Sequence, residues 1–336
     1  MMIPATLEAF EAEFGSTAVE QAELPVVLGT SVLSETEFDD LEIPERSALC
    51  GDWFKEGDTG YVYGKRGLGK SWLALDLGRA LTEGRQFGPW SVSRAWRVLY
   101  VDGEMSAEDL RSRNTALRDK RSELMFLSHQ VLFDRTQKAL CLSETAQQAE
   151  LTTLCESMNV DVLILDNVAC LFRGIEENSA DHWREHVEHW LLDLRRRGIA
   201  VVIVAHAGRN TATMRGTSKR EDSAFWIIRV DEASGGDGRN GAKFITRFVK
   251  NRNSPDDPVA LEWSIRPDGN RVLVTYRQAD NLALFRQWIE DGLDTCSDIA
   301  EEMGLSKGQV SKLAKQAEKA GWLRKVGRKY QLIHGS

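Results

Sequence analysis

Eight residues, Gly64 to Ser71, have the types and spacing needed to hold a polyphosphate. They read Gly-Lys-Arg-Gly-Leu-Gly-Lys-Ser and fit the pattern G-x-x-x-x-G-K-[ST] at every fixed position. Glycines let the backbone turn its N–H groups toward phosphate, in conformations that a Cβ would block. Lys70 would reach the β- and γ-phosphates, and the Ser71 hydroxyl would bind Mg²⁺. The pattern therefore predicts a site for ATP and Mg²⁺, with nucleotide contacts from Gly64, Lys65, Arg66, Gly67, Leu68, Gly69, Lys70, Ser71 and Trp72.

Three further polar residues, Glu104, Asp166 and His206, closely follow apolar runs typical of buried strands. The carboxyl ends of parallel strands meet at one edge of a sheet, where such sheets bind ligands. We expect Asp166 to hold the metal or its water, Glu104 to orient the attacking water as a base, and His206 to sense the γ-phosphate. Asp102 competes with Glu104 for the role of the base, and a carboxylate at a strand end can also be a helix cap or a solvated residue.

Alternating apolar runs and amphipathic stretches between residues 46 and 279 predict the elements that position these side chains. Their order indicates strands and crossover helices in a mostly parallel α/β sheet flanked by helices. Beyond residue 205 the pattern favours antiparallel strands that extend one edge of this sheet. The expected strands of the first part are Tyr61–Tyr63, Arg97–Val101, Val131–Phe133, Val162–Leu165 and Ile199–Ala205, the helices are Lys70–Glu83, Ala107–Arg121, Thr145–Met158 and Ala180–Arg197, and the later strands are Phe225–Val230, Lys243–Lys250, Val259–Ile265 and Arg271–Tyr276.

The composition of the 336-residue chain, with 42% hydrophobic and 28% charged residues, is that of an ordinary globular protein. Five scattered cysteines, an odd number without a CxxC pair, favour reduced thiols and a cytoplasmic location. We expect neither secretion nor membrane spanning, because the sequence shows no basic and apolar leader and no apolar run near eighteen residues.

The net charge of −8 is concentrated at one end of the chain. Residues 1–45 carry eleven acidic side chains and neither Lys nor Arg, so the remainder sums to about +3. We interpret them as an acidic N-terminal arm. The negative total therefore does not exclude nucleic acid as a partner.

Residues 281–336 are interpreted as a separate winged helix-turn-helix domain of three helices and a hairpin. Ser306 and Gln309 predict a capping box at the start of the third helix, and Gly321 ends it. Phosphate contact is the expected use of the basic surface, although winged helices also dock proteins. The residues expected to bind DNA here are Lys307, Lys312, Lys315, Lys319, Arg324, Lys325, Arg328 and Lys329.

Several short motifs resemble those of known ATPase families. Val162-Leu163-Ile164-Leu165-Asp166-Asn167-Val168-Ala169 resembles the second-strand motif of RecA-like ATPases, in which a catalytic glutamate also follows a strand, as Glu104 does. The run from residue 165 to 179, together with His206-Ala207 and Arg215-Gly216-Thr217-Ser218, resembles plasmid RepA-type hexameric replicative helicases. Val249-Lys250-Asn251-Arg252-Asn253 resembles the K-x-R element of DnaB-type replicative helicases. The resemblance covers roughly residues 46–255.

This resemblance implies a RecA-like core over residues 46–280 and a homo-oligomer, such as a hexameric ring, with ATP between subunits. Arg215 matches the family position of an arginine finger acting in trans, and Lys250 and Arg252 match the pair that reaches a neighbour's γ-phosphate. RepA-type chains tend to have two histidines where this chain has Ala205-His206. Head-to-tail contacts that close form rings and those that do not close form filaments, and the sequence leaves both open.

The basic stretch 208–220 is suited to line a central channel and contact a nucleic acid backbone there. The alternative is that it is a solvated surface loop. Its residues expected to bind DNA are Arg209, Lys219 and Arg220. The sequence thus predicts an oligomeric DNA translocase or helicase in DNA replication, with single-stranded DNA in the channel and duplex at the winged helix. Two alternatives stay open: an ATP-controlled DNA-binding regulator or recombination mediator that separates no strands, and a phosphoryl-transfer enzyme for a small acceptor.

Overall fold

The computed structural model describes residues 31–118, 122–175, 180–208, 214, 219–233, 241–254, 258–303 and 305–333. The chain divides into two units, residues 1–46 and 47–336, and each is described by itself. In the first unit, helix α3 (Glu35–Asp39) begins after Ser34, and the side chains of Ser34 and Glu37 form a reciprocal capping box. This helix buries none of its residues. Every other element of the described residues belongs to the second unit.

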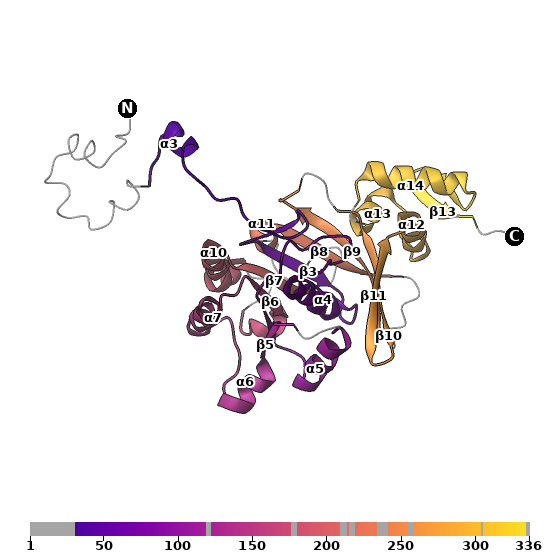
Figure 1. The fold of residues 1–336 in the computed structure, drawn as a ribbon. Coiled ribbons are helices and arrows are strands. Elements are labelled where there is room, and N and C mark those ends of the chain that lie inside the picture. Colours follow the sequence, from indigo (N-terminus) through magenta and orange to yellow (C-terminus); the bar gives the residue numbers. More distant parts are fainter. Residues whose placement is uncertain are drawn as a thin grey trace. The chain divides into compact units, whose positions relative to one another are not determined.

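The second unit is built on a sheet whose described strands follow the order β11-β10-β9-β8-β3-β7-β6-β4-β5 (Figure 1). The strands from β8 to β5 are parallel to one another, and β9, β10 and β11 continue the sheet in antiparallel fashion. A separate hairpin of β1 (Ala48–Cys50) and β2 (Phe54–Lys55) precedes the sheet. The strands are β3 (Thr59–Gly64), β4 (Val98–Asp102), β5 (Met125–Ser128), β6 (Val162–Asp166), β7 (Ala200–His206), β8 (Trp226–Glu232), β9 (Ala242–Asn251), β10 (Leu261–Asp268) and β11 (Arg271–Gln278).

Helices cover both faces of the parallel strands, with α4 and α5 on one side and α7 and α10 on the other (Figure 1). In β6, Val162 and Ile164 join the core under α4, whereas Leu163 and Leu165 join the core under α7 and α10. Burial on both faces explains why the parallel strands are almost continuously apolar. The helices of this part are α4 (Lys70–Glu83), α5 (Ala107–Ala116), α6 (His129–Thr136), α7 (Thr145–Ser157), α8 (Val168–Leu171), α9 (Ala180–Trp183), the π-helix η2 (Arg184–Glu188), α10 (His189–Arg196) and α11 (Lys219–Ser223).

The expected fold class, a mostly parallel α/β sheet flanked by helices and extended by antiparallel strands, is confirmed. The expected strand Val131–Phe133 is wrong, because these residues lie in α6 and the edge strand is β5 instead. A run of three apolar residues fits a helix as well as a strand. Both Val131 and Phe133 are at least one-third exposed, so the run is not a buried strand. The expected helix Ala107–Arg121 is also shorter, since α5 ends at Ala116.

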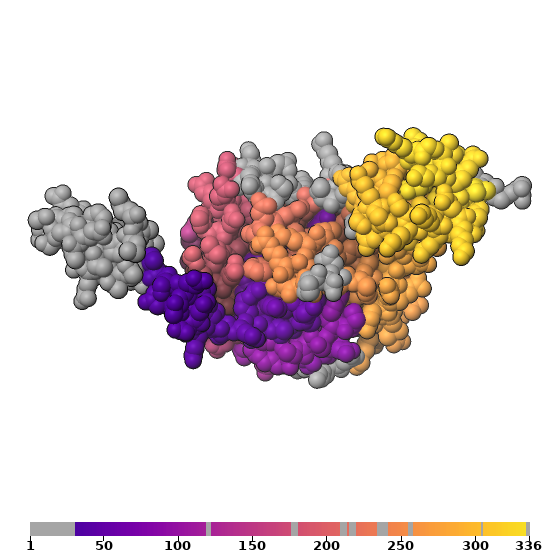
Figure 2. Space-filling view, turned by 90° about the horizontal axis from the view of Figure 1, so that it is seen from above, coloured from indigo at the N-terminus to yellow at the C-terminus, as the bar shows by residue number. Residues whose placement is uncertain are grey.

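Residues 281–333, here called the C-terminal module, contain α12 (Asn281–Glu290), α13 (Cys296–Met303), α14 (Lys307–Lys319) and the hairpin of β12 (Leu323–Val326) and β13 (Lys329–Leu332). The expected capping box of Ser306 and Gln309 is present at α14. The module shares an apolar core with Ala233 and Ile245 of the sheet region. In Figure 2 the yellow C-terminal residues lie against the orange strands. The module is therefore packed on the antiparallel side of the sheet.

All five cysteines are free thiols, as their odd number and scattered positions suggest. Cys50 and Cys155 are buried. Among the described residues, no helix combines the length and the apolar character required to cross a bilayer.

Candidate nucleotide site

The phosphate loop, residues 64–71, joins the end of β3 to the start of α4. Gly67 and Gly69 have φ values of 79° and 101°, which favour glycine. A Cβ at Gly69 would lie 2.8 Å from the Ala242 side chain, and one at Gly64 would clash with the carbonyl oxygen of Val230. Glycine at these positions thus lets the loop approach strands β8 and β9 closely. The N-terminus of α4 opens directly onto the loop and favours an anion there.

Lys70 is buried, and its ammonium group donates to two carbonyl oxygens of its own loop. The distances from Nζ are 2.9 Å to the oxygen of Gly64 and 2.6 Å to that of Lys65. Burial lowers the pKa of Lys70 to about 8, although the carboxylates of Asp166 and Glu104 act in the opposite direction. The ammonium group thus closes the loop and stands where a polyphosphate would compete for it.

Asp166 lies at the carboxyl end of β6 and is buried. The Tyr100 hydroxyl donates to its Oδ2 at 2.6 Å, and the Ser71 hydroxyl also hydrogen-bonds to it. Burial raises the pKa of Asp166, while both hydrogen bonds act to lower it. A hydroxyl beside a carboxylate offers the hard oxygen ligands that Mg²⁺ prefers. Ser71 and Asp166 therefore fit the expected metal, although the described residues contain no cluster of three or more His, Cys, Asp or Glu side chains for one.

Glu104 follows β4, and its carboxylate accepts a hydrogen bond from the Asn167 side chain. The turn that carries it is fixed, because the Asp102 carboxylate accepts from the backbone N–H of Met105 at 3.3 Å. Asp102 itself is fully buried, and burial raises its pKa to about 7. Glu104 lines the nucleotide cavity and Asp102 does not, so the geometry favours Glu104 as the base.

One open cavity of about 470 Å³ brings the predicted residues together, within the size range of ligand sites. Of the expected nucleotide and catalytic residues, its lining includes Arg66, Gly67, Gly69, Lys70, Ser71, Trp72, Glu104, Asp166 and His206. The remaining loop residues, Gly64, Lys65 and Leu68, line a separate small cavity. Eight lining residues were not expected from the sequence: Met105, Ser106, Asp109, Arg113, Asn167, Val204, Gly241 and Ala242.

Some of the eight unexpected lining residues lie next to predicted site residues in the sequence, and others are distant from them. Asn167 directly follows Asp166, and Ser106 caps α5 three residues before Asp109, so position along the chain pointed to them. Gly241 and Ala242 lie more than 160 residues beyond the phosphate loop. They reach the cavity because β9 passes beside Gly69, which no local pattern indicates.

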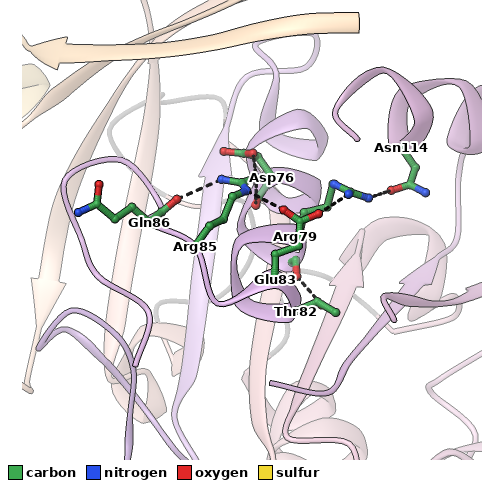
Figure 3. A network of polar contacts seen from close by, with 8 residues as sticks. Asp76, Arg79, Thr82, Glu83, Arg85, Gln86 and Asn114 are labelled. Carbon is green, nitrogen blue, oxygen red and sulfur yellow. Dashed lines mark hydrogen bonds and ion pairs between the residues drawn. The ribbon is translucent and has the colours of Figure 1, made fainter. Parts of the chain in front are cut away.

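A buried charged network holds α4 against α5 (Figure 3). Arg79 pairs with Glu83 and donates to the Asn114 side chain of α5 at 3.0 Å. Arg85 pairs with Asp76 and, at 3.1 Å, with Glu83. The network therefore fixes the helix that starts at the phosphate loop relative to the helix that follows Glu104.

Lys250 and Arg252, expected to act on a neighbouring subunit, lie outside the cavity lining. Lys250 donates to the carbonyl oxygen of Glu221, and Arg252 donates to that of Asp222 at 2.8 Å. Both carbonyl groups belong to α11, so the two cations close its C-terminal end. Their action in trans stays a prediction, and Arg215 lies outside the described residues.

Arg220, expected to contact DNA, is only 2% exposed. Its guanidinium carbon lies 4.1 Å from the centroid of the Trp183 ring, a cation–π contact. The expectation is wrong for this residue, because a guanidinium buried against Trp183 does not reach a phosphate backbone. Arg209 and the side chain of Lys219 lie outside the described residues.

The basic residues of the C-terminal module are exposed, as phosphate contact would require. Lys329 already forms an ion pair, because its ammonium group lies 2.7 Å from the Asp294 carboxylate. Arg324 donates to the Gln331 side chain at 3.2 Å. The exposed residues are Lys307, Lys312, Lys315, Lys319, Arg324, Lys325, Arg328 and Lys329.

Comparisons with known proteins found one family and similar solved structures. A family model described as an AAA domain matches residues 26–212, more than half of the chain. No curated protein matches the sequence. Among solved structures, a KaiC-like protein from the hyperthermophilic archaeon Pyrococcus horikoshii is similar, at 16% identity and a TM-score of 0.45. That match covers 66% of this chain and 91% of the other.

Proposed function

Starting from a chain that belongs to the AAA domain family, we propose that this protein is an oligomeric ATPase that moves along or unwinds DNA. The observation that carries the ATPase part is the single cavity shared by Lys70, Ser71, Glu104, Asp166 and His206. These side chains come from three strand ends and the phosphate loop, and each has the chemistry that phosphoryl transfer to water needs.

Each residue has a distinct role in this proposal. The loop N–H groups and Lys70 bind the phosphates, while Ser71 and Asp166 hold Mg²⁺, which neutralises phosphate charge when bound. Glu104, held by Asn167, orients the attacking water and accepts its proton. His206 stands at the end of β7, beside Gly64 across the parallel ladder, where it can respond to the γ-phosphate.

The DNA part of the proposal rests on charge. The eight exposed cations of the C-terminal module lie on α14 and on the β12–β13 hairpin, with the single acid Glu318 among residues 303–336. Thr295 forms an isolated bridge to Lys329 of that hairpin, which supports the interpretation as a winged helix. Phosphate contact by such a surface gives sequence-independent, salt-sensitive binding.

The test is ATP hydrolysis by the purified chain with and without single-stranded DNA, in the wild type and in Lys70→Ala. We expect hydrolysis that DNA stimulates and that Lys70→Ala abolishes. Unchanged hydrolysis in Lys70→Ala would refute the proposed site. Particle size with an ATP analogue and DNA tests assembly, and a six-fold particle would support the ring.

One observation favours a second function, an ATP-controlled DNA-binding regulator that separates no strands. Arg220 is buried, so one of the expected channel contacts is lost, whereas the exposed cations of the C-terminal module remain. A strand-displacement assay with a forked duplex separates the two functions. DNA-stimulated hydrolysis without displacement would favour the regulator.

A further inference from the structure

A second, smaller cavity of about 80 Å³ lies between the phosphate loop and the C-terminal module. This volume is enough for a few water molecules. The loop contributes Gly64, Lys65 and Leu68 to its wall, and the end of β8 contributes a second side. Helix α12 supplies the remaining side through Leu284, Gln287 and Trp288, together with Asp291, which directly follows the helix. Some residues of the phosphate loop therefore line the nucleotide cavity, and others line the small cavity against the C-terminal module.

The module is tied to this end of the sheet by buried charges. The Arg229 guanidinium donates to carbonyl groups in the last turn of α13, which satisfies part of the helix C-terminus. Asp231 lies 2.9 Å from Arg229 and 3.4 Å from Arg247. Arg247 in turn donates to the side chain of Asn281, the first residue of α12, at 3.2 Å. Separating such a network would leave buried charges unpaired, so the network holds α12 and α13 against β8 and β9.

The same arginine also touches the strand that leads into the phosphate loop. Tyr63 stands opposite Arg229 in the parallel ladder of β3 and β8, and its hydroxyl hydrogen-bonds to the guanidinium. The next pair in the ladder is Gly64 and Val230, and these residues line the small cavity. Arg229 therefore links β3 and α13 directly.

The middle of the phosphate loop is less crowded than its two ends. Gly64 and Gly69 lie too close to neighbouring strands for even a Cβ, whereas Gly67 has open space around its Cβ position. Lys70 now donates to the carbonyl oxygens of Gly64 and Lys65, and a polyphosphate competes for this ammonium group. Filling the loop would release these carbonyls, and because Lys65 and Leu68 line the small cavity, a shift of these two residues would change the cavity against α12.

We propose that the phosphate loop and the C-terminal module form one allosteric unit, in which a nucleoside triphosphate closes the small cavity and tightens α12 and α13 on the sheet. This inference rests on the proposed nucleotide site. By linkage, any ligand that prefers the tightened module raises the affinity for nucleotide by the same factor. Lys70, exchanging carbonyl groups for phosphate, is the switch between the two states.

The test is hydrogen exchange of the full chain with and without Mg²⁺ and adenylyl imidodiphosphate, in the wild type and in Lys70→Ala. We expect amide exchange in α12 and α13 to slow by about fivefold or more when the loop is filled, in keeping with usual allosteric coupling. In Lys70→Ala the slowing should vanish in the loop and in the module together.

The outcomes separate this inference from the proposed function. Slower exchange in residues 64–71 with no change in 281–303 would overturn the inference and leave the nucleotide site standing. No change in residues 64–71 would overturn both. Slowing of the module in Lys70→Ala without slowing of the loop would mean that nucleotide acts elsewhere, and would overturn the inference.

A pair of variants tests the route through the cavity. Leu284 and Ile289 are both buried apolar residues of α12, but only Leu284 lines the small cavity. Leu284→Ala should remove half or more of the nucleotide-dependent slowing in α13, and Ile289→Ala should retain it. Equal effects of the two substitutions would refute the route. If both variants fail to fold, the wild-type exchange experiment still decides the inference.

Discussion

The lowered pKa of Lys70 makes a quantitative prediction about nucleotide affinity and pH. Burial brings this pKa to about 8 in the empty site, whereas an ammonium bound to phosphate stays charged far above that value. Only the charged form binds a triphosphate well, so the apparent Kd equals the intrinsic Kd divided by the charged fraction. Affinity is therefore full well below pH 8 and falls as pH rises through that value.

The size of the effect follows from the same pKa. The charged fraction is about 0.76 at pH 7.5 and about 0.03 at pH 9.5, so the apparent Kd should rise about 25-fold between them. Calorimetric titration with Mg²⁺ and adenylyl imidodiphosphate at half-unit steps measures it. Lys70→Met, which cannot titrate, should bind weakly without this slope. A wild-type affinity that stays constant over this range would refute the reasoning, because it would mean that Lys70 keeps an ordinary pKa in the empty site.

Three further substitutions test the site and its surroundings, and a fourth, Arg184→Met, serves as a control for an exposed ion pair. Glu104→Gln should slow ATP hydrolysis by about 10²–10⁴-fold with little loss of nucleotide binding, as for a removed general base, and equal loss of both would contradict its role. Tyr100→Phe removes one of the two hydroxyl groups that donate to the buried Asp166 and should lower the free energy of unfolding by about 1–3 kcal/mol in urea titrations. Arg79→Met removes one of the two arginines that pair with the buried Glu83 and leaves only the partly exposed Arg85, so it should cost up to about 3–5 kcal/mol. The exposed pair broken by Arg184→Met should cost about 0–1 kcal/mol, and comparable losses would show that the buried network does not stabilise the fold.

Much of the nucleotide site was predictable because its residues are local or stand at strand ends. The phosphate loop is one continuous motif, and the apolar runs before Glu104, Asp166 and His206 are buried strands of one parallel sheet. In such a sheet, the end of each strand determines which residue faces the ligand. Their proximity could therefore be predicted from the sequence without knowing the order of the strands.

The parts that could not be predicted depend on which distant strands become neighbours. Gly69 needs to be glycine partly because Ala242 packs against it, and that contact exists only once β9 has joined the sheet. Arg220 reads as a solvated cation in a basic stretch, but tertiary packing places it over Trp183. Likewise, Arg229 lies in an apolar strand, and its partners on α13 come from about 70 residues further along the chain. Periodicity describes the faces of an element, not the neighbour that covers each face.

The cations at the end of β9 show how a local contact and a predicted role in trans can be compatible. Lys250 and Arg252 close the C-terminus of α11, and such an interaction between a cation and a helix end contributes about 0.3–1 kcal/mol at an exposed position. A charge-assisted hydrogen bond to a phosphate is roughly twice as strong as a neutral one, so a neighbour's nucleotide could outcompete these carbonyl groups. Exchange of partners would then free the end of α11, whose first two residues are the last two of the basic stretch 208–220. The contacts within one chain are thus compatible with the predicted action in trans, and if a neighbour's nucleotide takes these cations, we expect α11 to loosen when that nucleotide binds.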